Sequence, residues 1–439
     1  MSRSTSTGRR TYGVRCFAPK NSARTTEGRT RRQKRALTDN WRFIYKSCET
    51  ALAVAVHTIS SSIDSRNPCE LIQLDFSKAF DRISHVLLDS KLQRLGIQGS
   101  LLHWIRDFVS GRTQRVVFHG SASPPSTVLS GVPQGSVLGP TLFSIYINDL
   151  TTSLNTKAIL YADDLTLIQP LNTTDAYDRL QNNLDICYRW SQVNGLPLNP
   201  TKSVCLTISH MSKKQVTPPA LTLGDTPIPR VAHTKLLGIT KDSKLDFYRH
   251  ICDVASKARR TLGFITHVTR QLQPDAFKNL YTALVLPQLE FCSAIWGPHL
   301  HSRESTLESI QRRAAYTFYR RSTPRAMLLT YRAASTENLL RNARWQTLQH
   351  RRNVASIRLF CLIMGSDDMD CSNRPRINKR TGRLQPVLSR TLRHRRTCLL
   401  RAAELWMALP PELTTAIPSD RESIKELCQL ISRVHGWHV

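Results

Sequence analysis

Apolar and polar positions change their spacing several times along the chain, and these changes predict a mixture of strands and helices. An apolar run that ends in an acid at 71–75 is typical of a buried strand. Leucines at helical spacing follow over 85–96 and again over 100–111, and each of these segments ends at a glycine. We expect one further short strand at 114–120.

The next stretch predicts a helix, a β-hairpin and a longer helix. The helix covers about 137–150, and the apolar and β-branched runs of 158–169 flank two acids, Asp163 and Asp164, at the bend of the hairpin. The longer helix covers 174–195, where apolar residues recur on one face. Because helices and strands do not alternate regularly, the pattern favours an α+β fold over a doubly wound one. Further along, the pattern becomes predominantly helical.

Composition adds a polyanionic partner to this picture. The chain has 439 residues, with 62 Lys and Arg against 32 Asp and Glu, which gives a net charge of +30. Such an excess indicates nucleic acid in preference to a membrane surface. No apolar run approaches the roughly 18 residues of a membrane span, and no secretory signal is visible.

The cysteines and the first residues indicate the setting. Eleven cysteines are scattered without a C-x-x-C pair, so neither a disulfide framework nor a zinc site is indicated, and a reducing intracellular compartment is the simplest interpretation. Residues 1–38 are basic and poor in aliphatic side chains, which predicts a disordered tail. The run "RRQKR" at 31–35 fits phosphate contact or nuclear import, and a solvated leader or a gene-model error fits equally well.

The adjacent acids raise a chemical question. Two carboxylates a few ångströms apart repel each other, which raises at least one pKa unless a cation offsets the repulsion. An ordinary Asp-Asp turn is the simpler explanation for Asp163 and Asp164 taken alone. A further acid, Asp75, stands at the end of the strand predicted at 71–75. Two strands that present acids at one sheet edge could hold two Mg²⁺ ions, which activate a 3′-hydroxyl and stabilise leaving pyrophosphate.

Five motifs carry a family resemblance. They are "LDFSKAFD" (74–81), "SGVPQGSVLGPTLF" (130–143), "YADD" (161–164), "GLPLNPTKS" (195–203) and "HTKLLGI" (233–239). Their order and spacing resemble the palm motifs of reverse transcriptases. The wording of the second motif and of "LYTALVLPQLEFCSAIWGP" (280–298) is similar to the LINE-type, non-LTR, jockey-like branch. The resemblance covers roughly 47–330 and, more weakly, 393–413.

This resemblance implies an architecture. The expected fold is an α+β right-hand polymerase with an antiparallel palm sheet and flanking helices. Its expected parts are a disordered basic tail at 1–38, a palm with a remnant of fingers at 39–245, a helical thumb at 246–330 and a basic helical extension at 331–439.

The resemblance also implies a catalytic centre. Asp75, Asp163 and Asp164 would bind two Mg²⁺ ions, with Mn²⁺ as an alternative, and the carbonyl of Phe76 would help to hold the ion on the nucleotide side. Lys202 matches the lysine that protonates departing pyrophosphate. The alternative is that Lys202 is an exposed lysine without a catalytic role.

Further positions match the family's substrate-binding residues. Phe80 corresponds to a ring beneath the incoming sugar that would clash with a 2′-hydroxyl, although a core phenylalanine is the alternative. Gln134 and Gly135 lie in a loop that lines the nucleotide and the template base. The primer grip would comprise Leu236, Leu237 and Gly238. Contacts to the nucleic-acid backbone would come from the thumb residues Lys257, Arg259, Arg260 and Arg270.

The implied function is RNA-directed DNA synthesis from dNTPs on a template RNA, starting at the 3′-hydroxyl of a DNA primer or target, without a membrane partner. The expected location is intracellular, in the nucleus or in a cytoplasmic ribonucleoprotein. The stretch 40–52 departs from the family, because it retains "SCETAL" without the Gly-Phe-Arg pattern of the fingers, and no upstream endonuclease is visible. The alternative is therefore an inactive, truncated remnant that only binds nucleic acid.

Overall fold

The computed structural model describes residues 47–209, 218–298, 300–365, 375, 384–385, 389–414, 417–418 and 420–433. The tail expected at 1–38, including the 31–35 motif, lies outside these residues. From Asn40 to Val439 the chain forms one compact unit. No helix within the described ranges is long and apolar enough to cross a membrane.

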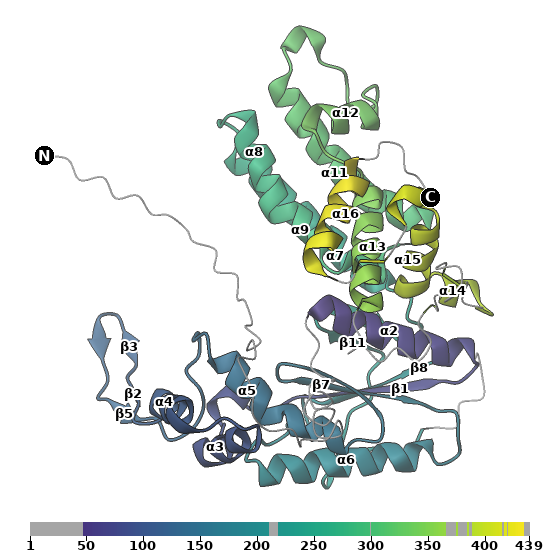
Figure 1. The fold of residues 1–439 in the computed structure, drawn as a ribbon. Helices are drawn as coiled ribbons and strands as arrows, with labels where there is room; N and C mark the ends of the chain where they lie inside the picture. Colours follow the sequence, from purple (N-terminus) through teal and green to yellow (C-terminus); the bar gives the residue numbers. More distant parts are fainter. Residues whose placement is uncertain are drawn as a thin grey trace, which may run out of the picture. The chain divides into compact units, whose positions relative to one another are not determined.

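A four-stranded antiparallel sheet organises the first half of this unit (Figure 1). Its strands are β1 (Cys69–Leu74), β6 (Lys157–Tyr161), β7 (Asp164–Pro170) and β8 (Val204–Ile208). They lie in the order β6-β7-β1-β8, so β1 has a hydrogen-bonded partner on each side. The expected buried strand and the expected hairpin are confirmed.

Helices cover both faces of this sheet, which explains why its strands contain nearly continuous apolar runs. On one face lies α2 (Cys48–Asp64), whose first turn is capped by the side chain of Ser47, and it shares a core with Leu71 of β1. On the other face lies α6 (Ala176–Val193), which shares a second core with Ile72 (Figure 1). Successive residues of β1 therefore enter different cores.

The segment between β1 and β6 is mainly helical. Its helices are η1 (Ala79–Asp81), α3 (His85–Arg94), α4 (Gly99–Val109), α5 (Gly139–Ile147) and η2 (Asn148–Ser153). The helices expected over 85–96, 100–111 and about 137–150 are thus confirmed.

The single strand expected at 114–120 is wrong. The chain instead forms a narrow arm of four two-residue strands: β2 (Thr113–Gln114), β3 (Val117–Phe118), β4 (Ser121–Ala122) and β5 (Ser126–Thr127). His119 and Gly120 both have positive φ and turn the chain back on itself, so β3 pairs with β4. No residue of the arm belongs to a hydrophobic core formed by the described residues, and Phe118 is exposed despite its apolar side chain.

Two small hairpins follow β8. They are formed by β9 (Thr222–Leu223) with β10 (Thr226–Pro227), and by β11 (His233–Leu236) with β12 (Ile239–Asp242). The second of these contains the residues expected to grip a primer.

The rest of the described chain is almost entirely helical, as its pattern predicted. The helices are α7 (Tyr248–Val268), α8 (Pro274–Leu280), the π-turn η3 (Tyr281–Val285), α9 (Leu286–Glu290), α10 (Ser293–Trp296), α11 (His301–Ser322), η4 (Arg325–Met327), α12 (Thr336–Ala343), α13 (Leu348–Met364), α14 (Leu392–Arg395), α15 (Cys398–Met407), η5 (Pro411–Leu413) and α16 (Arg421–Arg433).

One hydrophobic core crosses both boundaries that we expected within this unit. It begins on the α2 face of the sheet and continues through α7 and α11 to Ile431 of α16. The helical half is thus packed directly against the sheet's own covering helix. The division into parts at 245/246 and 330/331 stays a functional prediction.

Candidate active site

The three predicted carboxylates lie at the adjoining ends of two neighbouring strands. Leu74, the last residue of β1, pairs with Leu165 of β7. Asp75 follows Leu74 and Asp164 precedes Leu165, so these two acids lie next to each other where the antiparallel pairing of β1 and β7 ends. Neighbouring residues of this kind have Cα atoms about 4.5–5.5 Å apart. Asp163 precedes Asp164 in the tight turn that joins β6 to β7. The sheet therefore brings all three acids to one end of β1 and β7.

The turn itself explains how two acids can stand side by side. Tyr161 pairs with Asp164, which leaves a two-residue turn of Ala162 and Asp163. Of these two, only Ala162 has a positive φ, at 52°, and the chain reverses direction within these two residues. Asp163 is then carried at the exposed tip of the hairpin.

The three acids lie close together, and this affects the pKa of Asp164. The pKa of Asp164 is raised, first because neighbouring atoms remove part of its hydration and then because of the charges of Asp163 and Asp75. The residue as a whole is exposed, so this loss of hydration concerns its carboxylate in particular. Within the described part of the chain, no lysine or arginine pairs with the three acids. The cluster therefore carries negative charge that no described lysine or arginine compensates.

These acids fit a hard divalent cation by their chemistry, because unneutralised carboxylate oxygens are the donors that Mg²⁺ prefers. Among the described residues, no three His, Cys, Asp or Glu side chains converge closely enough to enclose an ion by themselves. Mg²⁺ does not need such a cage, since it commonly keeps waters and substrate phosphates in its coordination shell.

The segment 195–203, which we call the clasp, forms hydrogen bonds to the chain at the end of β1. The backbone N–H of Asn199 donates to the carbonyl of Asp75 at 2.8 Å, and the N–H of Asp75 donates to Oγ of Ser203 at 3.3 Å. Ser203 is fully buried and donates in turn to the carbonyl of Asn199 at 2.8 Å. Lys202 lies in this clasp and is exposed. Sequence reasoning singled out Lys202 and missed Ser203, although both end the same motif.

The two predicted phenylalanines have different surroundings. Phe76 is 4% exposed, bridges to Leu198 and meets the ring of Trp190 edge-on, with centroids 6.3 Å apart. Phe80 is half-buried and stacks on Phe143 at 4.4 Å. The structure thus supports a packing role for both rings, and Phe80 keeps one part of its surface accessible.

The glycine-rich loop 130–135 lies directly on the segment that follows β1. A Cβ at Gly131 would approach the carbonyl oxygens of Phe80 and Asp81 to 2.7 Å, so only glycine fits. Oγ of Ser130 donates to the carbonyl of Asp81 at 2.8 Å, and Nε2 of Gln134 donates to its carboxylate at 2.7 Å. Gln134 and the following Gly135 are exposed.

Asp81 was overlooked in the sequence. As the second acid of "LDFSKAFD", it could have been found there, and it orients the side chain of Gln134.

The β11–β12 hairpin is attached to β1 two residues before Asp75. Nε2 of Gln73 donates to the carbonyl of Lys235 at 3.1 Å, and Oγ1 of Thr234 donates to Oε1 of Gln73. Since alternate residues of a strand face the same side, this hairpin borders the face that carries the Asp75 carboxylate.

The predicted grip residues occupy the turn of this hairpin. Leu236 is buried, whereas Leu237 and Gly238 both have positive φ, as a type I′ turn requires. A Cβ at Gly238 would meet the Phe291 ring at 2.9 Å. The tight turn therefore depends on glycine for packing as well as for backbone conformation.

The four predicted thumb cations lie apart from this cluster. Helix α7 buries a stripe that includes Ala258 and Leu262, while Lys257, Arg259 and Arg260 are exposed on its other sides. Arg270, just beyond the helix, is exposed as well. Among the described residues, no contact joins these cations to the three acids.

Comparison with known proteins gives a family. Residues 29–265 match the family described as "Reverse transcriptase (RNA-dependent DNA polymerase)". The chain is 29% identical over 274 residues to "Probable RNA-directed DNA polymerase from transposon X-element" of Drosophila melanogaster, which covers 59% of this chain and 29% of that protein. It is also 29% identical over 236 residues to "RNA-directed DNA polymerase from mobile element jockey" of Drosophila funebris, covering 51% of this chain and 25% of the relative.

The chain thus spans less than a third of the length of these curated relatives. Among solved structures, apo telomerase from Candida tropicalis aligns with a TM-score of 0.41 and 12% identity, over 67% of this chain and 52% of that one.

Proposed function

The chain belongs to the reverse transcriptase family, and we propose that it is the RNA-directed DNA polymerase of a non-LTR retrotransposon of the jockey-like type. In this proposal the chain extends a DNA primer or nicked target with dNTPs on an RNA template. Synthesis on chromosomal DNA would take place in the nucleus.

The sheet and its two covering helices would be the palm of a right-hand polymerase. We assign residues 39–245 to this palm with a remnant of fingers, 246–330 to the thumb and 331–439 to a basic extension. The antiparallel sheet with acids at the end of its central strand supports the first assignment. The exposed cations of α7 support the second.

Asp75, Asp163 and Asp164 would hold the two Mg²⁺ ions. When bound, such ions lower the pKa of the attacking 3′-hydroxyl and stabilise the charge on leaving pyrophosphate. The chain's contribution is placement: β1 and β7 present the acids side by side, and the Asn199 and Ser203 bonds hold the backbone of Asp75.

Other residues would position the nucleotide. Lys202, carried by the clasp around Asp75, would donate a proton to the pyrophosphate. Phe80 would present its accessible surface beneath the sugar, where a 2′-hydroxyl would clash. Gln134, oriented by Asp81, and Gly135 would line the nucleotide and template base, and the carbonyl of Phe76 would face the nucleotide-side ion.

Two further sets would hold the primer–template. The turn of the β11–β12 hairpin, which borders the acids through Gln73, would grip the primer end with Leu236, Leu237 and Gly238. The exposed side of α7 would bind backbone phosphates without reading sequence. Its contact residues would be Lys257, Arg259, Arg260 and Arg270.

The observation that carries this proposal is the register of β1 and β7, which brings Asp75 beside Asp164 and the turn residue Asp163. The test is extension of a labelled DNA primer on an RNA template with Mg²⁺ and dNTPs. The Asp163→Asn variant should lose extension, and Asp178→Asn, at an exposed acid of α6, should retain it. If the chain binds the primer–template without extending it at any Mg²⁺ or Mn²⁺ concentration, it is a nucleic-acid-binding remnant.

A further inference from the structure

A second basic surface lies at the C-terminal end of α11 and in the loop 323–335 that leads to α12. Between Glu308 and Glu337 the chain contains no Asp or Glu but six arginines. They are Arg312, Arg313, Arg320, Arg321, Arg325 and Arg332. In Figure 1, this loop lies at the end of the helical half that is remote from the four-stranded sheet. It is therefore distinct from the acid cluster.

Two of the six arginines serve the fold. Arg312 donates to the carbonyls of Tyr331 at 2.8 Å and Ala334 at 3.1 Å, and its guanidinium stacks 4.1 Å from the centroid of the Tyr331 ring. Arg321 donates to the carbonyls of Thr266 and Thr269. The guanidinium groups of Arg312 and Arg321 are therefore occupied by contacts within the protein.

The other four guanidinium groups are exposed. Arg313, Arg320, Arg325 and Arg332 all lie on the surface, and within the described ranges none of them pairs with a carboxylate. Arginines without local acids are available to phosphates, which their planar donors can bind in a bidentate manner.

The loop between them has a defined conformation. Tyr319 donates its hydroxyl to the carbonyl of Met327 at 2.9 Å, and Tyr316 donates to the carbonyl of Leu329 at 3.2 Å. Together with Arg312, these side chains hold alternate backbone carbonyls of the loop against α11. The loop is therefore pre-organised, which lowers the entropy that a ligand must overcome on binding.

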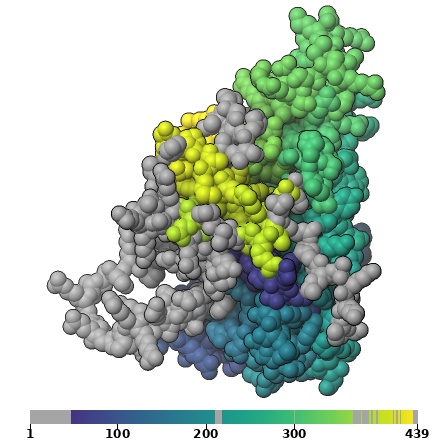
Figure 2. Space-filling view, turned by 90° about the vertical axis from the view of Figure 1, so that its right-hand side faces the viewer, coloured from purple at the N-terminus to yellow at the C-terminus, as the bar shows by residue number. Residues whose placement is uncertain are grey.

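The same alternate residues present apolar side chains to solvent. Met327 is 72% exposed, Leu329 is 52% exposed and Tyr331 is 37% exposed. Arg325 begins this row of alternate positions and Arg332 follows it. In Figure 2 the green atoms of the region around 300–345 stand free at the upper edge of that view. Proteins that bind single-stranded nucleic acid combine cations with exposed aromatic side chains on which bases stack. Here Tyr331 is the aromatic member of an exposed row that also contains Met327 and Leu329 and lies between Arg325 and Arg332.

We propose that this surface, defined by Arg313, Arg320, Arg325, Met327, Leu329 and Arg332, binds a single-stranded segment of RNA outside the polymerising centre. The arginines contact phosphates. The apolar row contacts the faces of bases, which stack on one another and are inaccessible in a duplex. The choice of RNA rests on the proposed function, in which the template is RNA and its unpaired part is the single strand that extends beyond the primer. The surface would hold this strand while the acid cluster acts on the primer end.

The test uses the full chain and a fluorescein-labelled single-stranded RNA of about 20 nucleotides, with no primer and no dNTP. Fluorescence anisotropy gives the Kd at several salt concentrations for the parent and for three variants. Arg325→Gln/Arg332→Gln removes two phosphate contacts, and Met327→Ser/Leu329→Ser removes the apolar row. The matched control, Arg94→Gln/Arg189→Gln, removes the same charge from exposed positions on α3 and α6. Circular dichroism verifies that each variant is folded.

We expect the arginine variant to weaken binding by about tenfold and to reduce the log–log salt slope by roughly 1.4, since each single-strand phosphate contact contributes about 0.7. The Met327→Ser/Leu329→Ser variant should weaken binding with an unchanged slope, and only on the single strand. The control should bind like the parent. If both site variants bind like the control, or lose as much affinity for duplex RNA of the same sequence, the proposal is wrong.

Primer extension on a short primer–template measures the proposed function separately. A chain that binds RNA through this surface without extending a primer would remove the polymerase proposal and leave the binding surface in place. A chain that extends primers, but whose site variants bind RNA like the control, would leave the polymerase proposal in place and remove the RNA-binding surface.

Discussion

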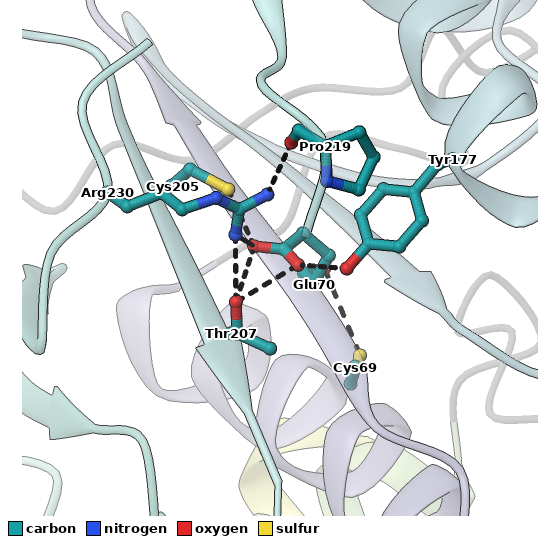
Figure 3. Close-up of polar contacts among 7 residues, drawn as sticks. All are labelled: Cys69, Glu70, Tyr177, Cys205, Thr207, Pro219 and Arg230. Carbon is teal, nitrogen blue, oxygen red and sulfur yellow. Dashed lines mark hydrogen bonds and ion pairs between the residues drawn. The ribbon is translucent and has the colours of Figure 1, made fainter. Parts of the chain in front are cut away.

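The two ends of β1 hold acids in opposite circumstances. At its start, Glu70 is completely buried and surrounded by partners (Figure 3). Arg230 donates to one of its carboxylate oxygens at 2.8 Å, Tyr177 donates to the other at 3.3 Å and Thr207 donates to both. At the other end, Asp75 is half-buried and forms no ion pair with any described residue. The strand thus carries a neutralised acid near its start and is followed by an acid that no described residue neutralises.

This contrast separates a structural role from a functional one. A buried charge without a partner is strongly destabilising, so Arg230 stabilises the fold by pairing with Glu70. Arg230 also donates to the carbonyl of Pro219, which ties the segment ahead of β9 to the sheet (Figure 3). Asp75 and Asp164 repel each other, and neither pairs with a described lysine or arginine, so the proposed metal ions would explain their placement together. The lesson is that missing partners locate the candidate site better than buried ionic contacts do.

The variant Asp75→Asn tests most directly whether Asp75 serves function and not the fold. If Asp75 serves catalysis, this change should reduce primer extension by roughly 10³-fold, at the upper end of what removing one electrostatic contact costs. It should also leave the free energy of unfolding unchanged or slightly higher, because it relieves repulsion with Asp164. Extension rates and urea unfolding measure the two effects. A variant that loses stability while keeping its activity would assign Asp75 to the fold.

At the other end of the strand, Arg230→Ala should do the opposite. Removing one partner of a buried ion pair costs about 3–5 kcal/mol, and somewhat less here because the Arg230 side chain is 30% exposed. Urea unfolding should show this loss, whereas extension by the fraction that remains folded should persist. Arg189→Ala, at an exposed arginine of α6, provides the control and should change stability by less than about 0.5 kcal/mol. Equal stability of the two variants would contradict the structural role of Arg230.

A buried lysine sharpens the same distinction. Lys241 of β12 is 1% exposed, and its Nζ has no hydrogen-bond partner among the described residues. Burial lowers its pKa to about 7, so above pH 7 the folded chain holds mainly the neutral amine, whereas the unfolded chain keeps the charged form up to the normal pKa of lysine. Between pH 7 and the normal pKa of lysine the unfolded state binds more protons, so stability from this group rises with pH by up to about 1.4 kcal/mol per unit.

The Lys241→Met variant should therefore be more stable than the parent at pH 7, and the difference should shrink toward pH 10. Urea unfolding at several pH values measures it. A difference that stays constant over this range would show that Lys241 is charged in the folded protein.

The smallest expected effect concerns the clasp around Asp75. Ser203→Ala removes the hydroxyl that accepts from Asp75 and donates to Asn199, which should cost about 1 kcal/mol of stability. Because it loosens the backbone that carries Asp75, it should also reduce extension several-fold. Ser191→Ala, at a buried serine of α6 whose hydroxyl donates to the Tyr188 carbonyl, is the matched control. It should cost similar stability without slowing extension, and equal rates for both variants would rule out a positioning role for Ser203.

Local patterns in the sequence determined much of the fold. Apolar spacing and terminal glycines predicted the helices α3, α4 and α6, the strand β1 and the β6–β7 hairpin. The pattern failed at 114–120, where apolar letters predicted one strand and the chain forms an exposed arm. Alternation shows which side chains share a face, but not whether any core lies against that face.

The candidate site divides in a similar way. Asp75, Asp163, Asp164, Gln134 and Gly238 were found as motif letters, because short motifs record residue types that chemistry demands. Asp81 and Ser203 were missed, since their value lies in contacts with Gln134 and Asp75 that are remote in sequence.

The sequence by itself determined which residues are acidic, that a strand lies near 71–75 and a hairpin at 158–169, and how much positive charge the chain carries. Only the tertiary structure decided which charges have partners. It buried Glu70 against Arg230, 160 residues away, and left Asp75 beside two other acids. The physical reason is that the free energy of a charge depends on its neighbours and its hydration, and long-range packing sets both.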